Sequence, residues 1–321
     1  MTKIPVVFAF DDNYALPASI ALKTLMDSKK SDTEYEVIIF HAGLKTETMK
    51  KIESICSVRW MKIDASVLKG APTGYSALAT YYRLFMADLL PEYDKIIWSD
   101  VDVFFKGDLS DIYNQDMQGA DWGGIRAEVR GETLGVHTHF PENKKPYVYM
   151  PGFMLVNAKQ WREKKMLDRF LNIINKYGPK LRMFDLDVLN LAANKIMEIP
   201  FNYCVLDNVY HFDDIEKIPE YPWLSNAWKK EDLLQAKENP IIIHYAGGVN
   251  GKIWRCGKST IPAYYWDEIV RSPFYRPEDY ECSPRELILY YFLKAIRHWI
   301  FVTSWRKKVK AKIKILKEKR G

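Results

Sequence analysis

Cysteine is scarce in this chain of 321 residues and is nowhere closely paired. The four cysteines, Cys56, Cys204, Cys256 and Cys282, are scattered, and no two have the Cys-x-x-Cys spacing of a zinc or redox centre. We therefore expect no disulfide framework, and a reducing compartment fits this composition. Residues 1–5 also lack the charged and apolar regions of a signal peptide, which favours a cytoplasmic protein.

Two glycine-rich signatures of phosphate binding are also missing. No Gly-x-Gly-x-x-Gly follows the first predicted strand, and the chain contains no Gly-x-x-x-x-Gly-Lys loop. A loop of backbone N–H groups is therefore not available to cradle a diphosphate. If this chain binds a nucleotide diphosphate, a metal and side chains must neutralise it.

Excess positive charge is missing from most of the chain. The net charge is +6, but residues 294–321 alone hold 11 Lys or Arg and one acidic residue, a local charge of +10. The remaining residues therefore carry about −4, counted in the same way. A basic body that wraps nucleic acid is excluded, and we expect no nucleic-acid partner.

The C-terminal segment lacks the uninterrupted apolar run of a transmembrane helix. Residues 287–305 are apolar and aromatic but are broken by Lys294, Arg297 and His298. Their apolar positions recur at helical spacing ahead of the lysine-rich end, which predicts a helix lying on anionic lipid at the inner face of the cell membrane. The alternative is a helix docked on the body. We predict a catalytic domain over residues 1–275 and a membrane-associating tail over residues 276–321.

Strand and helix patterns alternate through the first half of the chain. The expected strands are residues 4–10, 37–40, 60–63, 96–98, 123–129, 154–157 and 241–243. The expected helices are residues 20–26, 45–55, 76–90, 158–177 and 185–194, with few clear elements between 200 and 240. This alternation is typical of an α/β fold, a mostly parallel sheet covered by helices.

One buried strand ends abruptly in two carboxylates, Asp100 and Asp102. Residues i and i+2 of a strand point to the same side, so both carboxylates would project together at the edge where open α/β sheets bind ligands. They repel each other unless a cation lies between them, which indicates a divalent metal and an anionic substrate. His244, directly after another strand, can complete the site, and its imidazole favours Mn²⁺ over Mg²⁺.

Other polar residues have both a functional and an ordinary structural interpretation. Asp11, Asp12 and Asn13 follow the first strand, and such a polar cluster on its own is more typical of a turn than of a binding site. Its position at the predicted binding edge of the sheet nevertheless favours contacts with a base or ribose. Asp185 begins a helix and is equally well explained as a capping acid. An arginine within a helical pattern, such as Arg83, is normally a solvated surface residue. The same interpretation applies to His137 and His139, which lie in a polar loop. Lys252 follows a glycine-rich turn and can supply charge to a phosphate.

Six segments, taken in chain order, resemble glycosyltransferase family 8. They are residues 8–14 (FAFDDNY), 82–84 (YRL), 100–102 (DVD), 151–157 (PGFMLVN) with Trp161, 185–190 (DLDVLN) and 244–247 (HYAG). This family comprises retaining enzymes and includes bacterial lipopolysaccharide glucosyl- and galactosyltransferases and glycogenin. The resemblance implies a GT-A fold, a single Rossmann-like domain. It also implies transfer of glucose or galactose from a UDP-sugar to a saccharide acceptor of lipopolysaccharide or another cell-surface glycan.

The resemblance also implies a role for each matched residue. The metal, Mn²⁺ or alternatively Mg²⁺, would be held against the diphosphate by Asp100, Asp102 and His244. The donor would be bound by Ala9, Asp11, Asn13, Tyr14, Val101, Gly152, Gly247 and Lys252. Arg83 and Asp185 would line the donor sugar and act in catalysis.

Three departures from the family pattern bear on mechanism. Met150 and Leu186 stand where the family commonly has Asn and Gln, and Lys252 comes two residues later than the usual lysine. Leucine is not a nucleophile, so a covalent intermediate at position 186 is excluded and front-face substitution is favoured. Met150 and Leu186 also motivate a non-catalytic sugar-nucleotide binder as an alternative. A phosphohydrolase of the haloacid dehalogenase kind is a further alternative, although Phe104 stands where that family has Thr.

Overall fold

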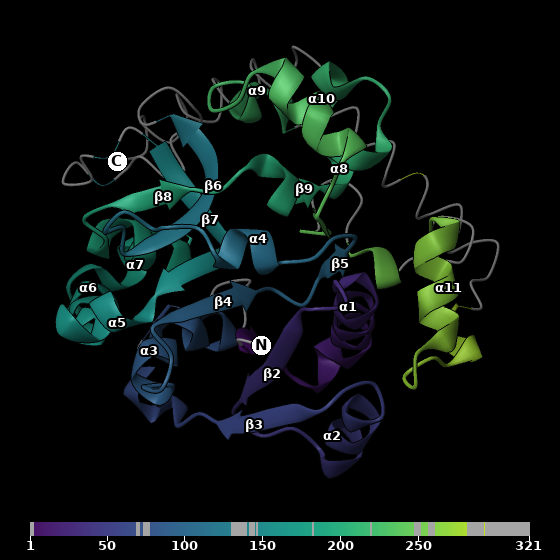
Figure 1. Cartoon of the computed structure of the whole chain (residues 1–321), viewed down its shortest axis with the longest axis horizontal. Coiled ribbons are helices and arrows are strands. Elements are labelled where there is room, and N and C mark those ends of the chain that lie inside the picture. Colours follow the sequence, from purple (N-terminus) through teal and green to yellow (C-terminus); the bar gives the residue numbers. More distant parts are fainter. Residues whose placement is uncertain are drawn as a thin grey trace, which may run out of the picture.

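The computed structural model describes most of the chain up to residue 280. The described residues are 3–68, 71–72, 78–129, 140, 145, 147–181, 183–218, 220–246, 252–255, 261–280 and 292. They form a seven-stranded sheet with helices on both faces and a second sheet of three strands (Figure 1). The structure therefore confirms the expected α/β fold.

The large sheet is parallel in its first half and mixed in its second. Its strand order is β3-β2-β1-β4-β7-β6-β8, and β1, β2, β3 and β4 run parallel, whereas β7 is antiparallel to both β4 and β6. The strands are β1 (Lys3–Ala9), β2 (Glu34–His41), β3 (Val58–Lys62), β4 (Lys95–Ser99), β6 (Trp122–Val129), β7 (Tyr147–Asn157) and β8 (Ile196–Glu198). Apolar residues cover both faces of the central strands, as expected for buried parallel strands.

Two hydrophobic layers cover the sheet. Val6 and Phe8 of β1 pack into a cluster with Leu22 and Leu25, whereas Val7 between them packs into the cluster on the opposite face. In Figure 1, α5, α6 and α7 gather on one side of the sheet and α1 on the other. The helices are α1 (Ala15–Ser28), α2 (Thr46–Glu53), α3 (Met86–Leu89), α4 (Ser110–Tyr113), α5 (Ala158–Glu163), α6 (Met166–Tyr177), α7 (Asp185–Ala192), α8 (Asp207–His211), α9 (Tyr221–Leu224), α10 (Lys230–Glu238) and α11 (Ala263–Arg271).

The small sheet brings distant parts of the chain together beside the end of β4. It has the order β5-β10-β9, with β5 (Val103–Phe105), β9 (Val205–Leu206) and β10 (Ile242–His244). β10 runs antiparallel to β5 and parallel to β9. Since β5 starts directly after Asp102, this sheet places the C-terminal half of the chain against the paired carboxylates.

Three expectations about helices were wrong. Residues 78–85 form a 3₁₀ helix followed by the short α3, because residues 81–85 are all buried and an amphipathic helix would expose one side. The helix expected over residues 158–177 breaks at Lys165, whose φ of 51° separates α5 from α6. Residues 200–240, where few clear elements were expected, contain the short helices α8, α9 and α10.

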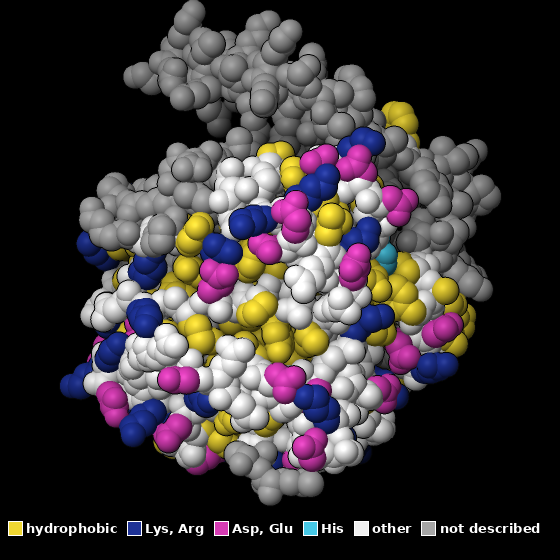
Figure 2. All heavy atoms as spheres, turned by 45° about the horizontal axis from the view of Figure 1, so that its top comes forward, with side chains coloured by type: hydrophobic (Ala, Val, Ile, Leu, Met, Phe, Trp, Pro, Cys, Tyr) yellow, Lys and Arg dark blue, Asp and Glu magenta, His cyan; other side chains and the backbone are white. Residues whose placement is uncertain are grey.

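The described surface carries both signs of charge. Figure 2 shows Lys and Arg interspersed with Asp and Glu over one face of the molecule, with small apolar patches between them. Among the residues that the structure describes, no helix is long and apolar enough to cross a bilayer. The predicted membrane-binding helix of residues 287–305 lies outside the described residues, apart from Phe292.

Candidate functional site

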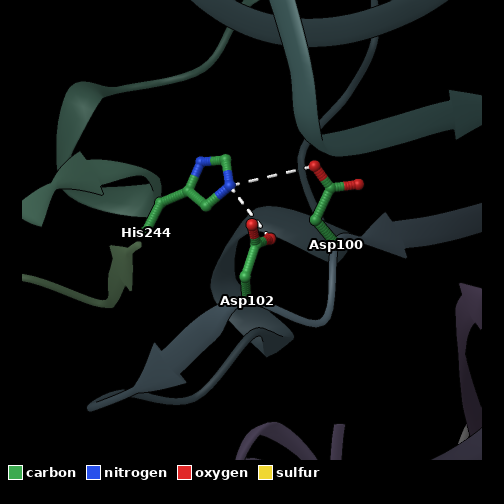
Figure 3. Close-up of side chains that lie close together, drawn as sticks. All are labelled: Asp100, Asp102 and His244. Atoms are coloured by element: carbon green, nitrogen blue, oxygen red, sulfur yellow. Dashed lines mark hydrogen bonds and ion pairs between the residues drawn. The ribbon is translucent and has the colours of Figure 1, made fainter. Parts of the chain in front are cut away.

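Asp100, Asp102 and His244 converge from two strands (Figure 3). Nε2 of His244 lies 3.2 Å from Oδ1 of Asp102 and 3.8 Å from Oδ2 of Asp100. One ligand atom from each residue lies within 4.8 Å of the other two. Asp102 and His244 are buried, and Asp100 is partly exposed. The structure thus brings these three predicted residues together.

The register between β5 and β10 creates this convergence. His244 is paired with Val103, the residue that follows Asp102, and the backbone N–H of Tyr245 donates to the carbonyl of Asp102 at 2.8 Å. A shift by one residue would turn His244 to the opposite side of the strand. The site therefore depends on backbone pairing between residues about 140 positions apart in the chain.

Gly152 forms the wall of the cluster. Its carbonyl accepts a hydrogen bond of 2.8 Å from the backbone N–H of Asp100. A Cβ atom at this position would lie 2.8 Å from Cε1 of His244 and 3.4 Å from Oδ2 of Asp100. Only glycine leaves room for the imidazole to stand beside the two carboxylates.

Arg83 is buried, so its interpretation as a solvated surface residue was wrong. Its Nη2 donates to Oδ1 of Asp100 at 2.8 Å, and its Nε lies 3.1 Å from Oδ2 of Asp185. Nη1 donates to the carbonyl of Pro151, and the guanidinium carbon lies 4.7 Å from the ring centre of Trp98. The 3₁₀ turn thus directs Arg83 inward, where it holds Asp100 in place.

The two acids at the start of α7, Asp185 and Asp187, have different partners. Oδ2 of Asp187 accepts the backbone N–H of Met183 at 2.8 Å, at the start of the helix. Asp185 instead pairs with Arg83. Burial raises the pKa of Asp185 to about 6, although Arg83 opposes this shift. Asp185 therefore has its partner in the cluster, whereas Asp187 bonds to the backbone just before α7.

Lys252 brings a positive charge to the carboxylate of Asp102. Its Nζ pairs with Oδ2 of Asp102 and lies 5.9 Å from the ring centre of Tyr14 and 5.4 Å from that of Trp254. Burial opposes ionisation of Asp102, but His244 and Lys252 outweigh it and hold the pKa of this carboxyl well below its usual range. Asp102 is therefore an anion in a mostly buried site.

The remaining predicted donor-binding residues lie at the ends of β1 and β4. Ala9 ends β1, which pairs with β4 two residues earlier through Val7 and Trp98. Oδ1 of Asp11 accepts the backbone N–H of Asn13 at 2.9 Å, so Asp11 forms the predicted turn and remains exposed. The predicted donor-binding residues at these strand ends are Ala9, Asp11, Asn13, Tyr14 and Val101. Gly247, His137 and His139 lie outside the described residues.

The sequence reasoning missed two residues of this site. Nε1 of Trp98 donates to Oδ1 of Asp100 at 3.2 Å. Sγ of Cys204 lies 3.2 Å from Nδ1 of His244. The position of Trp98 two residues before Asp100 was a usable signal, because both side chains leave the strand on the same side. No local pattern points to Cys204.

The residues of the cluster fit a divalent cation. Two carboxylates and one imidazole nitrogen form a mixed oxygen and nitrogen donor set. Burial opposes protonation of His244, but Cys204 and Asp102 outweigh it and raise the pKa of its imidazole well above the ordinary value. The donor set itself, with one ligand atom from each of the three side chains in close reach, is what fits a cation.

Several known proteins are similar to this chain. The chain is 21% identical over 261 residues to General stress protein A of Bacillus subtilis (strain 168), covering 76% of this chain and 85% of that protein. It is 23% identical over 250 residues to the lipopolysaccharide 1,2-glucosyltransferase of Escherichia coli (strain K12), covering 75% and 70%. The solved structure of the galactosyltransferase LgtC with donor and acceptor sugar analogs aligns with a TM-score of 0.67 and 19% identity, covering 86% of this chain and 98% of LgtC.

The structural likeness to LgtC assigns the GT-A fold. The model of the family described as Glycosyl transferase family 8 matches residues 5–256, which include every segment on which the sequence resemblance rested. The chain belongs to glycosyl transferase family 8.

Proposed function

We propose that this protein is a retaining hexosyltransferase that moves glucose or galactose from a UDP-sugar to a saccharide of lipopolysaccharide or another cell-surface glycan. Family membership supports sugar transfer and excludes the haloacid dehalogenase alternative. The observation that carries the finer proposal is the cluster of Asp100, Asp102 and His244, at the edge of the sheet where β1 and β4 end.

Asp100, Asp102 and His244 would hold Mn²⁺ or Mg²⁺. When bound, the cation neutralises the negative charge of the departing UDP. The chain's own residues prepare this site. Arg83 and Trp98 occupy one oxygen of Asp100 and leave Oδ2 facing His244, and Lys252 supplies a second positive charge for the diphosphate.

The nucleoside would lie along the ends of β1 and β4. The exposed carboxylate of Asp11 and amide of Asn13 offer hydrogen bonds to a base or ribose, and the aromatic ring of Tyr14 offers a face for stacking. Tyr14 lies within 6 Å of Lys252, which connects the proposed nucleoside contacts with the proposed diphosphate contact.

The proposed reaction is front-face substitution. The bond between the anomeric carbon and the UDP oxygen breaks while the acceptor oxygen attacks from the same side, and the UDP phosphate takes the proton of the acceptor hydroxyl. Leu186 supports this proposal, because it is a buried residue of α7 that has no nucleophilic atom. Asp185, buried and paired with Arg83, would line the donor sugar together with Gly152.

A donor screen monitored by UDP release tests the proposal. The full chain is incubated with UDP-glucose or UDP-galactose and Mn²⁺, and we expect slow UDP release with one donor even before an acceptor is known. Asp102→Asn should lower the rate by about 100-fold or more. Asp94→Asn is the matched control, because this side chain is 79% exposed at the opposite end of β4 and should leave the rate unchanged.

Two outcomes would overturn the proposal. Donor binding without UDP release from any UDP-sugar would favour the non-catalytic binder that Met150 and Leu186 motivate. Absence of both binding and release would contradict a sugar-nucleotide site altogether.

The C-terminal charge supports a peripheral location at the inner face of the membrane. Residues 294–321 carry a local charge of +10, which anionic lipid would attract. Such attachment would bring the enzyme to a lipid-linked saccharide acceptor. Nucleic acid is not a proposed partner, because the rest of the chain is slightly acidic.

A further inference from the structure

The cysteine beside the proposed metal ligand has a defined position. Sγ of Cys204 lies 3.2 Å from Nδ1 of His244, on the opposite side of the imidazole from Asp100 and Asp102. Cys204 is 1% exposed and His244 is 8% exposed. Among the described residues, Cys204 is the hydrogen-bonding partner of Nδ1, and Asp102 that of Nε2. Each ring nitrogen therefore has its own partner.

Several backbone contacts keep Cys204 at this distance. It follows a 3₁₀ turn over Phe201–Tyr203 and leads into β9, which pairs directly with β10. The backbone N–H of Cys204 donates to the carbonyl of Phe201 at 2.9 Å. The ring of Tyr203 stacks on Phe153, the residue after Gly152, with ring centres 5.6 Å apart. The thiol is thus fixed by the same strands that position His244.

Metal ligation by Nε2 places the remaining imidazole proton on Nδ1. A buried N–H group without an acceptor costs about 1–3 kcal/mol. Metal-ligating histidines usually donate this proton to a carboxylate, a carbonyl or water, which fixes the ring orientation. Here the acceptor in reach is a sulfur atom, which is a weaker acceptor than oxygen.

We propose that Cys204 is a positioning residue for the metal ligand His244: its sulfur accepts the Nδ1 proton and keeps Nε2 directed at the cation. This inference rests on the metal site of the proposed function and goes beyond it, because it assigns a role to a residue outside the matched motif segments. Cys204 would act through His244, because it is not one of the three residues whose ligand atoms cluster.

The affinity for Mn²⁺ alone tests this inference. Calorimetric titration of the full chain should give a dissociation constant about tenfold higher for Cys204→Ala than for the unmodified protein, at the low end of the usual effect because sulfur is a weak acceptor. Cys204→Ser keeps a hydroxyl acceptor on a shorter bond and should recover part of the affinity. Cys56→Ser is the matched control, because Cys56 is the other free cysteine of the described residues and lies in the turn between α2 and β3.

A spectroscopic measurement separates positioning from a merely structural role. With ¹⁵N-labelled histidine and Mg²⁺ as a diamagnetic ion, the Nδ1 signal of His244, assigned by its loss in His244→Gln, should show a protonated nitrogen. The signal should move in Cys204→Ser and Cys204→Ala, and not in Cys56→Ser. Thermal denaturation checks that each variant is folded. If Cys204→Ala does not fold, the comparison rests on Cys204→Ser.

The outcomes are distinguishable from failure of the proposed function. If the unmodified protein does not bind Mn²⁺, the metal site itself is wrong. If it binds Mn²⁺ but the folded Cys204 variants keep both the same dissociation constant and the same Nδ1 signal, the role of Cys204 is wrong.

Discussion

At the residue scale, the site is defined by what surrounds three ligand side chains. Arg83 and Trp98 hold one oxygen of Asp100, Lys252 holds one oxygen of Asp102, and Cys204 holds the far nitrogen of His244. Partners of this kind restrict each ligand to one orientation before a cation arrives. This preorganisation would suit the Asp-x-Asp pair to the proposed metal site.

Gly152→Ala tests the tight fit at the wall of the site. Its new Cβ would lie 2.8 Å from Cε1 of His244, so the imidazole has to move, and we expect Mn²⁺ to bind about tenfold more weakly or worse. Isothermal titration calorimetry measures this change. Gly123→Ala is the control, because the atoms nearest its Cβ would be side-chain atoms of Ile199 and Met197, away from the cluster. Equal Mn²⁺ affinity in Gly152→Ala and the unmodified protein would contradict the observed crowding.

Asp185 should give the protein a measurable pH dependence of stability. The pKa of this carboxyl rises from 3.8 to about 6, so the folded state binds its proton more tightly than the unfolded state does. This contribution to stability is fully present below about pH 4 and is lost as the pH rises through about 6.

Chemical denaturation of the unmodified protein and of Asp185→Asn at pH 4.5 and pH 7.5 measures this effect. The difference in unfolding free energy between the two proteins should change with pH, in favour of the unmodified protein at pH 4.5. Asp94→Asn, at an exposed position, should show no such change. A pH-independent difference for Asp185→Asn would contradict the raised pKa.

At the scale of elements, the buried side-chain amide of Asn190 links α7 to β7. Nδ2 of Asn190 donates to the carbonyls of Tyr149 and Leu186, and its Oδ1 accepts the N–H of Tyr149 at 2.9 Å. This side chain fixes the helix that starts at Asp185 against the strand that contains Gly152. The donor-sugar side of the proposed site therefore depends in part on these hydrogen bonds between α7 and β7.

Asn190→Ala should lower the free energy of unfolding by about 2–3 kcal/mol, because it leaves the Tyr149 backbone groups without their partner. Denaturant titration measures this loss. Asn172→Ala, at an exposed position of α6, should change it by about 0.5 kcal/mol or less. A loss of similar size in both variants would contradict a particular contribution of the Asn190 hydrogen bonds to stability.

The elements also show where sequence reasoning succeeds and fails. The strands that end at Ala9, Ser99 and His244 were expected, because apolar runs followed by polar residues are a local pattern. The burial of Arg83 was not expected, because a 3₁₀ turn and an α-helix have similar composition. The partners of the guanidinium, Asp185 at the start of α7 and Asp100 just after β4, are far from Arg83 in the sequence. Cys204 was missed because its role depends on the pairing of β9 with β10, which no local pattern encodes.

At the scale of the whole molecule, charge is separated along the chain. The described surface mixes both signs (Figure 2), whereas residues 294–321 are strongly basic. Residues up to 280 pack on the body: the Tyr280 hydroxyl donates to the carbonyl of Trp254 at 3.1 Å. The proposed division into a catalytic body and a membrane-associating tail can therefore be tested by cutting after this residue.

Truncation after residue 280 should release the protein from vesicles that contain phosphatidylglycerol, measured by cosedimentation. Replacing Arg306, Lys307 and Lys308 by Gln in the full chain should weaken this binding by about 100-fold, since each basic residue near an anionic surface contributes about 1 kcal/mol. Vesicles of phosphatidylcholine are the control and should bind neither protein strongly. Persistent binding of the truncated protein to the anionic vesicles would contradict a tail anchor.

In the proposed function, Asp100, Asp102 and His244 hold a cation against the diphosphate of a uridine nucleotide. The most direct measurement is calorimetric titration of UDP into the protein with and without Mn²⁺, in the unmodified chain, Asp102→Asn and the control Asp94→Asn. The structure predicts tight UDP binding that requires Mn²⁺ in the unmodified chain and in Asp94→Asn, and that is lost in Asp102→Asn. UDP binding of equal affinity with and without Mn²⁺, or unchanged in Asp102→Asn, would contradict it.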